Sequence, residues 1–266
     1  MKRFGLIGEK LSHSLSPQIH EYIFDALGLR GSYELFPVPK DKIPYVGHGM
    51  KLFNIQGLNV TIPYKEDIIT QLDQLSEEAK TIGAVNTIAL KEGRLLGYNT
   101  DYFGFGKMLD INGVSVLGKK AAVLGSGGSS KAVCAYLLDQ GAQHIFLITR
   151  QKETKHSNHP QITYLDYHDL KGLTGDLLIN TTPVGMYPHV GYSPVPSPII
   201  QNFDTLVDLI YNPIQSEFLK LGKGLGKKTI DGLYMLVAQA VKAQEIWQGQ
   251  PISDGVVQRV YDALKG

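Results

Sequence analysis

One segment constrains the fold of this chain more than any other: residues 119–150, KKAAVLGSGGSSKAVCAYLLDQGAQHIFLITR. Two short apolar runs flank a glycine-rich turn and a stretch whose apolar residues have helical spacing. Parallel strands need a crossover of a dozen or more residues, usually a helix, whereas antiparallel strands can be joined by a tight turn. The segment therefore predicts strand, turn, helix and strand with the two strands parallel, which places the chain in the α/β class.

The turn GSGGS follows the first apolar run and opens the expected helix. Gly125 permits a tight turn, and Gly127 lets the backbone approach a pyrophosphate, while the start of the helix offers N–H groups and the positive end of its dipole. Ser130 stands where the dinucleotide-binding fingerprint usually has its third glycine. The placement favours a dinucleotide site, and an ordinary strand-to-helix turn is the alternative.

The tip of the second strand bears on which dinucleotide would bind. NAD sites usually carry an acidic residue there, which binds the ribose 2′-hydroxyl. Here the strand ends at Thr149 and Arg150, with Lys152 just beyond and no acid. A guanidinium binds a 2′-phosphate bidentately, whereas a carboxylate would repel it. We therefore expect NADP, and a solvated strand-end cation is the alternative for Arg150.

The N-terminal part of the chain predicts further α/β structure. A helix is expected from Ser16, as its N-cap, with Pro17 in the first turn. The pattern at 65–84 predicts one amphipathic helix, and the stretch that follows predicts a β-hairpin turning at Glu92 and Gly93. Strands are expected at 2–8, 32–38 and 57–63.

The C-terminal part continues the strand and helix pattern. Strands are expected at 176–185, 205–211 and 227–232, and helices at 232–250 and 256–264. We interpret the whole as two α/β domains. The second is inserted into the first, and the C-terminal helices return to the first domain.

Composition narrows the class of protein. One cysteine, Cys134, excludes an internal disulfide framework, so the cytoplasm is the expected location. The formal net charge of +1 gives no electrostatic reason to expect binding to nucleic acid or to an anionic membrane. No apolar run approaches the ~20 residues of a membrane helix, and no ligand-rich cluster predicts a metal site. We expect an enzyme or binding protein for small molecules.

Lys65, in NVTIPYKED, is expected in the first turn of the helix at 65–84. A cation is mildly disfavoured there by the helix dipole. Lysine can act as an acid or base when desolvation or a positive field lowers its pKa. Asp101, at the end of GYNTD, could pair with it, but no periodicity connects the two residues. A solvated lysine and a helix-capping aspartate are the alternatives.

Seven motifs taken together resemble those of shikimate dehydrogenases, over essentially the whole chain. In order they are HSLSPQIH (13–20), NVTIPYKE (59–66), GAVNT (83–87), NTD (99–101), GSGGSSKA (125–132), NTTPVGM (180–186) and DGLYMLVAQA (231–240). The resemblance implies NADPH-dependent, reversible reduction of 3-dehydroshikimate to shikimate, on the route to chorismate and the aromatic amino acids. It implies an N-terminal α/β substrate-binding domain at 1–101, completed by 233–266, and a Rossmann-like NADP-binding domain at 102–232.

The resemblance also assigns roles to individual residues. Lys65 and Asp101 match the family's catalytic lysine and its partner aspartate. The substrate-binding positions are Ser14, Ser16, Thr61, Asn86, Asp101, Tyr211 and Gln239. The cofactor-binding positions are Glu77, Gly125, Ser126, Gly127, Gly128, Ser129, Thr149, Arg150, Lys152, Leu209 and Gly232. Ser14, Ser16 and Tyr211 would bind the substrate carboxylate, and Leu209 and Gly232 would lie around the nicotinamide.

Two alternatives remain at this point. A quinate/shikimate dehydrogenase would accept NAD or NADP, but serine at both 14 and 16 resembles the shikimate-specific pattern. The family's NADP clamp commonly reads Asn-Arg-Thr with a second arginine nearby, whereas this chain has TRQKETK, with Lys152 or Lys155 as the possible second cation. A catalytically silent cofactor-binding regulator is the second alternative. A monomer or a homodimer is expected.

Overall fold

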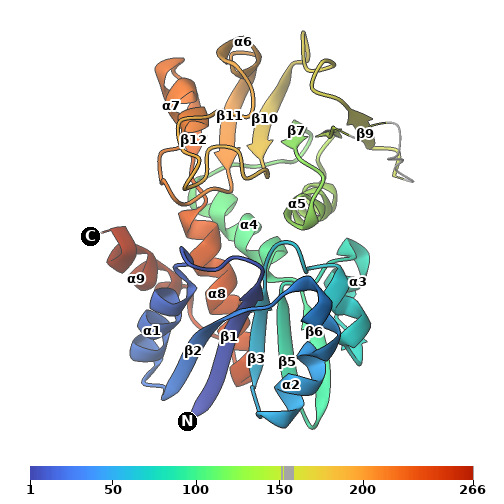
Figure 1. The fold of residues 1–266 in the computed structure, drawn as a ribbon. Coiled ribbons are helices and arrows are strands. Elements are labelled where there is room, and N and C mark those ends of the chain that lie inside the picture. Colours follow the sequence, from blue (N-terminus) through green and yellow to red (C-terminus); the bar gives the residue numbers. More distant parts are fainter. Residues whose placement is uncertain (151, 153–158, 266) are drawn as a thin grey trace. The chain divides into compact units, whose positions relative to one another are not determined.

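The computed structural model describes residues 1–150, 152 and 159–265. Contacts between Cα atoms divide the chain into two compact units. The first unit contains Met1–Gly104 and Val237–Gly266, and the second unit contains Phe105–Leu236. Figure 1 shows the elements of both units.

The first unit is built on a mixed six-stranded sheet in the order β2-β1-β3-β5-β6-β4. The strands are β1 (Lys2–Gly8), β2 (Gly31–Pro37), β3 (Gly57–Val60), β4 (Gln74–Leu75), β5 (Thr87–Lys91) and β6 (Arg94–Tyr98). β1 runs parallel to β2 and β3, and β5 runs antiparallel to β3 and β6. The expected strands at 2–8, 32–38 and 57–63 are therefore confirmed, with β3 shorter than expected.

Helices from both ends of the sequence belong to the first unit. Its helices are α1 (Ser16–Leu27), η1 (Lys40–Tyr45), α2 (Val46–Leu52), η2 (Asp67–Gln71), α3 (Glu77–Ile82) and α9 (Asp254–Lys265). Two more, α4 (Thr100–Ile111) and α8 (Leu233–Gln248), begin or end in the second unit. α1 and α9 lie side by side (Figure 1). The expected return of the C-terminal helices is confirmed.

Trp247 anchors α8 to the sheet. Its ring stacks on Phe4 of β1 with centroids 4.7 Å apart, and its Nε1 donates to the carbonyl oxygen of Ile88 at 2.9 Å. A Cβ on Gly57 would lie only 2.2 Å from that Nε1, so only glycine lets the indole reach this position. Helix α8, near the C-terminus of the sequence, therefore packs into the hydrophobic core of the first unit.

The single helix expected at 65–84 is wrong. The chain forms η2, then the two-residue strand β4, then α3. The N–H groups of Asp73 and Ser76 donate to carbonyl oxygens of Leu95 and Gly97 at 2.9 Å, and the Asp73 carboxylate accepts from the Leu95 N–H at 2.6 Å. Pairing with the edge of β6 therefore satisfies backbone groups that a helix would have satisfied internally. Lys65 consequently lies in a turn before η2, not in the first turn of an α-helix.

Two local expectations have different outcomes. The hairpin turn is confirmed, since Glu92 and Gly93 both have positive φ, 50° and 74°, as the favoured two-residue hairpin turns require. The expected N-cap is wrong, because Leu15 holds that position without a side-chain cap and Ser16 lies inside α1. The Ser16 hydroxyl is therefore available for other contacts.

The second unit is built on a parallel six-stranded sheet in the order β12-β11-β10-β7-β8-β9. Its strands are β7 (Lys120–Leu124), β8 (His144–Ile148), β9 (Ile162–Leu165), β10 (Gly175–Asn180), β11 (Phe203–Asp208) and β12 (Lys228–Ile230). Its helices include α5 (Gly128–Asp139), α6 (Ser197–Ile200) and α7 (Glu217–Gly224). This is the doubly wound order, in which ligands bind where the order reverses, beyond the carboxyl ends of β7 and β10.

Candidate functional site

Lys65 and Asp101 form a buried ion pair in the first unit. Lys65 Nζ lies 2.5 Å from Asp101 Oδ2, and each side chain is 10% exposed. The backbone of Lys65 is held by the Val85 N–H, which donates to its carbonyl oxygen at 2.7 Å. Asp101 lies in the first turn of α4, where the helix dipole favours a carboxylate. The structure therefore brings together the two residues that the sequence could only suggest as partners.

Asn86 holds the second oxygen of the Asp101 carboxylate. Its Nδ2 donates to Asp101 Oδ1 at 2.8 Å, and its Oδ1 accepts from the Thr100 N–H at 2.7 Å. A backbone N–H can only donate, so this contact fixes which way the Asn86 amide points. Two buried charges are costly unless they are paired and hydrogen-bonded, and Lys65 and Asn86 together meet that need for Asp101.

Gln239 and Thr61 lie on other elements of the same unit. Gln239, half-buried on α8, has its Oε1 3.2 Å from the Thr100 hydroxyl and 3.5 Å from Asn86 Nδ2. The Thr61 N–H, just after β3, donates to the carbonyl oxygen of Ile7 at 3.0 Å. A Cβ on Gly8 would lie 2.6 Å from Thr61 Cγ2, so this loop packs directly on β1.

Ser14 and Ser16 face each other at the start of α1. Ser14 Oγ donates to Ser16 Oγ at 3.1 Å, and the Ser16 N–H donates to Ser14 Oγ at 3.2 Å. Ser16 is 8% exposed and Ser14 is half-buried. Hydroxyl groups in this arrangement can donate to a carboxylate. The proximity agrees with the predicted role, which stays a prediction.

Sequence reasoning missed a buried polar group that supports these residues. Asn59 Nδ2 donates to Thr87 Oγ1 at 3.0 Å and to the carbonyl oxygen of Asn86 at 3.3 Å. Thr87 Oγ1 in turn donates to Asn86 Oδ1 at 3.1 Å. Asn59 is 5% exposed and Thr87 is fully buried. Their positions inside the motifs NVTIPYKE and GAVNT were the only available signal.

The glycine turn of the second unit has room for an anion. Gly125 has φ +102°, which favours glycine, and a Cβ there would lie 2.9 Å from Thr182 Cγ2. Among the described residues, a Cβ on Gly127 would meet nothing within 4 Å, so these residues leave the space above it open. Gly127 is the N-cap of α5 and supplies no capping side chain. A pyrophosphate therefore fits the geometry of this turn.

Ser130 explains why the third glycine of the fingerprint can be absent. Its side chain turns back, and its Oγ donates to the carbonyl oxygen of Gly127 at 2.6 Å. The residue is 1% exposed. The backbone of the turn therefore satisfies the hydrogen bond of this buried hydroxyl group.

The predicted 2′-phosphate clamp is only partly available. Arg150 is exposed. Burial raises the pKa of Tyr167, and the positive charge of Arg150 opposes that rise. Lys152 Nζ lies 2.5 Å from Asp169 Oδ2 and 3.9 Å from Asp166 Oδ2, so its charge is already engaged. Lys155 lies outside the described residues. Thr149 is buried, and its hydroxyl contacts Ser126 Oγ at 3.0 Å.

The backbones of Leu209 and Gly232 lie against each other, and their place around the nicotinamide stays a prediction. A Cβ on Gly232 would lie 2.2 Å from the Leu209 carbonyl oxygen. Leu209 follows Asp208, whose buried carboxylate accepts from Ser216 Oγ at 2.5 Å and from Asn180 Nδ2 at 3.0 Å. Tyr211 is half-buried, and burial raises the pKa of its phenol.

Glu77 has an interaction that does not depend on a cofactor. It opens α3, its side chain is 89% exposed, and its carboxylate pairs with Lys80 at 2.6 Å. This ion pair gives no support to the expected cofactor contact, which stays a prediction.

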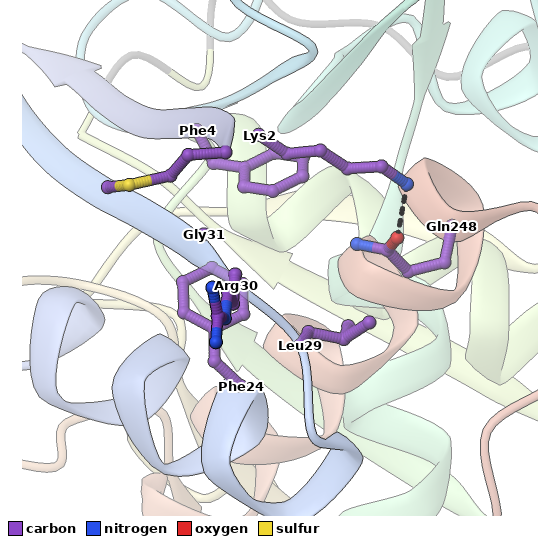
Figure 2. A pocket seen from close by; sticks show the side chains of 8 residues that line it. Lys2, Phe4, Phe24, Leu29, Arg30, Gly31 and Gln248 are labelled. Carbon is purple, nitrogen blue, oxygen red and sulfur yellow. Dashed lines mark hydrogen bonds between the residues drawn. The ribbon is translucent and has the colours of Figure 1, made fainter.

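A separate cavity of about 230 Å³ lies near the N-terminal residue of β1 (Figure 2). It is lined by Met1, Lys2, Phe4, Phe24, Leu29, Arg30, Gly31 and Gln248, which include none of the predicted site residues.

Within the described part of the chain, no helix is long and apolar enough to cross a membrane. The same part contains no group of three His, Cys, Asp or Glu residues that could hold a metal ion.

Comparison with known protein families and sequences gives a consistent result. Residues 6–88 match the family described as the shikimate dehydrogenase substrate binding domain. The shikimate dehydrogenase (NADP(+)) of Clostridium beijerinckii is 49% identical over all of this chain and 98% of that protein. The enzyme of the same name from Clostridium perfringens is 47% identical, over all of this chain and 99% of its own length.

Solved structures agree with the sequence comparisons. Shikimate dehydrogenase 1 from Peptoclostridium difficile has a TM-score of 0.93 and 51% identity, covering all of this chain and 98% of its own. Shikimate 5-dehydrogenase from Thermus thermophilus, solved with NADP(H) and shikimate, has a TM-score of 0.88 and 32% identity over 99% of both chains. The fold, the order of the motifs and the full-length similarity lead to one conclusion: the chain belongs to the shikimate dehydrogenase family.

Proposed function

We propose that this protein catalyses the NADP-dependent, reversible reduction of 3-dehydroshikimate to shikimate, in the pathway to chorismate and the aromatic amino acids. The observation that carries the proposal is the buried Lys65–Asp101 pair, 2.5 Å apart, in a chain 49% identical over its whole length to a shikimate dehydrogenase. A silent regulator on the same scaffold would have no need to keep two costly buried charges together.

The proposed catalytic groups are Lys65 and Asp101. Reduction of a ketone adds a hydride to carbon, which NADPH supplies when bound, and a proton to oxygen. The Lys65 ammonium donates that proton to the carbonyl oxygen, and in the reverse direction the neutral amine takes it from the substrate hydroxyl. Asp101 holds Nζ in place through its Oδ2, while Asn86 holds Oδ1. Both contacts keep the proton donor fixed before substrate binds.

The remaining polar residues are proposed to bind the substrate. Ser14, Ser16 and Tyr211 supply hydroxyl donors for the carboxylate. Thr61, Asn86 and Gln239 supply partners for the ring hydroxyls, as a substrate with several hydroxyl groups requires. The mutual contacts of the two serines and of Asn86 with Gln239 support this assignment.

The cofactor positions are proposed from the second unit and Glu77. The turn from Gly125 to Ser129 would hold the pyrophosphate, and Arg150, with Thr149 and Lys152 beside it, would face the 2′-phosphate. Leu209 and Gly232 would lie around the nicotinamide. The open space above Gly127 and the doubly wound sheet support NADP binding here. Accordingly we assign substrate binding to 1–101 with 233–266, and cofactor binding to 102–232.

A quinate/shikimate dehydrogenase is the second candidate, because the ion pair between Lys152 and Asp169 leaves a weaker clamp for the 2′-phosphate. Purified protein is tested for oxidation of shikimate and of quinate, each with NADP and with NAD, by absorbance of the reduced cofactor. Shikimate with NADP should be the best pair. Equal rates with quinate would favour the second candidate, and no turnover with any pair would refute both. A monomer or homodimer in the cytoplasm stays a prediction, to be measured by light scattering and cell fractionation.

A further inference from the structure

Tyr33, on β2, is hydrogen-bonded to the buried polar residues that support Asn86 but was assigned no role. Its hydroxyl donates to Asn59 Oδ1 at 2.8 Å. Its ring stacks on that of His20, with centroids 3.9 Å apart and an angle of 9° between the planes. Burial raises the pKa of the Tyr33 phenol, so the hydroxyl keeps its proton and remains a donor.

The contacts of the Asn59 amide allow only one orientation of its oxygen and nitrogen atoms. Asn59 Nδ2 faces the carbonyl oxygen of Asn86, which can only accept. The Asn59 oxygen must therefore face Tyr33, and the Tyr33 hydroxyl must donate to it.

The chain of hydrogen bonds continues toward the ion pair. Thr87 Oγ1 accepts from Asn59 Nδ2 and donates to Asn86 Oδ1. Asn86 Nδ2 then donates to Asp101 Oδ1, whose partner oxygen holds Lys65. Every donor in this sequence has its acceptor, so the orientation of one amide depends on that of the next.

The Tyr33 ring is held from the other side as well. Lys2 Nζ donates to Gln248 Oε1 at 2.6 Å. The dashed line in Figure 2 marks this hydrogen bond. Gln248 Nε2 must then donate to Gln244 Oε1, and Gln244 Nε2 to His20 Nδ1, each at 2.9 Å. These contacts fix His20, which is fully buried, directly against the Tyr33 ring.

His20 itself carries no charge. Burial lowers its pKa to about 3, and accepting at Nδ1 places its proton on Nε2. That Nε2 has no hydrogen-bond partner among the described residues. A neutral ring with one polar atom unmatched contributes packing against Tyr33 rather than proton transfer.

We propose that Tyr33 is a positioning residue for the Lys65–Asp101 pair. Its hydroxyl holds the amide of Asn59 in one orientation. Asn59 then acts through Thr87 and Asn86 to set the position of Asp101. This inference rests on the proposed function, because it assumes that shikimate is the substrate and that Lys65 and Asp101 are the catalytic groups.

The test is Tyr33→Phe, which removes one oxygen and keeps the stacked ring. We expect kcat for shikimate oxidation to fall about tenfold, while the shikimate Kd from calorimetry changes less than about threefold. Tyr22→Phe is the matched control, since the Tyr22 hydroxyl accepts from the exposed Gln18 side chain, at 3.2 Å, away from the proposed network. The control should keep wild-type kcat and Kd. A cooperative thermal transition in both variants establishes that they fold.

A double-mutant cycle with Asn59→Ala separates coupling from local packing. If Tyr33 acts through Asn59, Tyr33→Phe should lower kcat in the Asn59→Ala background by less than about threefold instead of about tenfold. Wild-type kcat in Tyr33→Phe, or factors that simply multiply in the double variant, would overturn the proposal. Failure of the proposed function is distinguishable, because it would appear as absence of shikimate turnover in the wild type itself.

Discussion

Replacing Gly232 by alanine should disturb both the stability of the second unit and its binding of NADPH. A Cβ at this position would lie 2.2 Å from the carbonyl oxygen, 2.5 Å from the carbonyl carbon and 3.0 Å from the Cα of Leu209. These are backbone atoms, which cannot rotate away as a side chain could. The segment after β11 and the start of α8 must therefore move apart to admit the methyl group.

The size of the effect follows from the contact. Inserting a methyl group into a packed region costs about 1–3 kcal/mol, and a rigid obstacle places this case near 3 kcal/mol. For a unit of this size, that loss corresponds to a fall in Tm of about 10 °C. Because Leu209 and Gly232 are both proposed to lie around the nicotinamide, we also expect the KM for NADPH to rise about tenfold, since displacing a group from its position costs binding.

Urea unfolding and initial rates at varied NADPH measure the two effects. Gly224→Ala is the matched control, because this glycine ends α7 and a Cβ there would meet nothing within 4 Å. Because this position is helical and has no clash, alanine should raise the free energy of unfolding by about 0.5 kcal/mol or less. If Gly232→Ala unfolded at the wild-type urea concentration with an unchanged KM, the contact with Leu209 would not have the stated importance.

Four further outcomes are expected. Lys65→Ala should lower turnover by orders of magnitude with the shikimate Kd within a few-fold, and a near-wild-type rate would remove the lysine from the mechanism. Arg150→Ala should raise the KM for NADPH more than that for NADH, while Lys152→Ala should do so less because its ammonium pairs with Asp169; equal effects of Arg150→Ala on both cofactors would contradict the clamp. Burial raises the pKa of Asp208 from 3.8 to about 6, so the folded state holds this proton more tightly and wild-type stability falls as pH rises between those values. The free energy of unfolding of Asp208→Asn minus that of wild type should therefore rise by about 2 kcal/mol between about pH 4 and about pH 7. Urea unfolding measures this difference, and a difference that does not change with pH would refute the raised pKa of Asp208. Lys65→Met should lower the free energy of unfolding by about 3 kcal/mol. Combining Lys65→Met with Asp101→Asn should recover most of that stability, while the double variant remains inactive.

Local patterns were enough to predict the elements whose hydrogen bonds are local or repeated. The strand, turn and helix at 120–148 are as expected, because each apolar run is buried in the parallel sheet. The hairpin at Glu92 and Gly93 was also predictable, since its turn chemistry lies in two adjacent residues. The expected helix at 65–84 failed because the bonds that decide this stretch go to Leu95 and Gly97, about twenty residues away. Periodicity contains no information about such partners.

Only part of the candidate site could be predicted from the sequence, for the same reason. The type and spacing of residues indicated the glycine turn, because its function is local to one strand and one helix. The pairing of Lys65 with Asp101 depends on three separate segments, since Asn86 must also be in place. Tyr33 could not be selected from the sequence, because a tyrosine in a strand is usually a packing residue, and Asn59 had no signal beyond its place inside the motif NVTIPYKE. Only the directions of their hydrogen bonds distinguish them.

The Lys65–Asp101 pair is better explained by function than by stability. Its two side chains are each only 10% exposed, so both charges have lost most of their water. Apolar or neutral replacements of a buried pair are often neutral or stabilising, whereas removing one partner leaves an unmatched charge. In Lys65→Met the Asp101 carboxylate would keep its hydrogen bond from the Asn86 amide but lose the charge that balances it. In the double variant an amide at 101 could still accept from Asn86 without any charge. If the double variant were less stable than Lys65→Met alone, the pair would be a stabilising element and the argument from its cost to its catalytic role would fail.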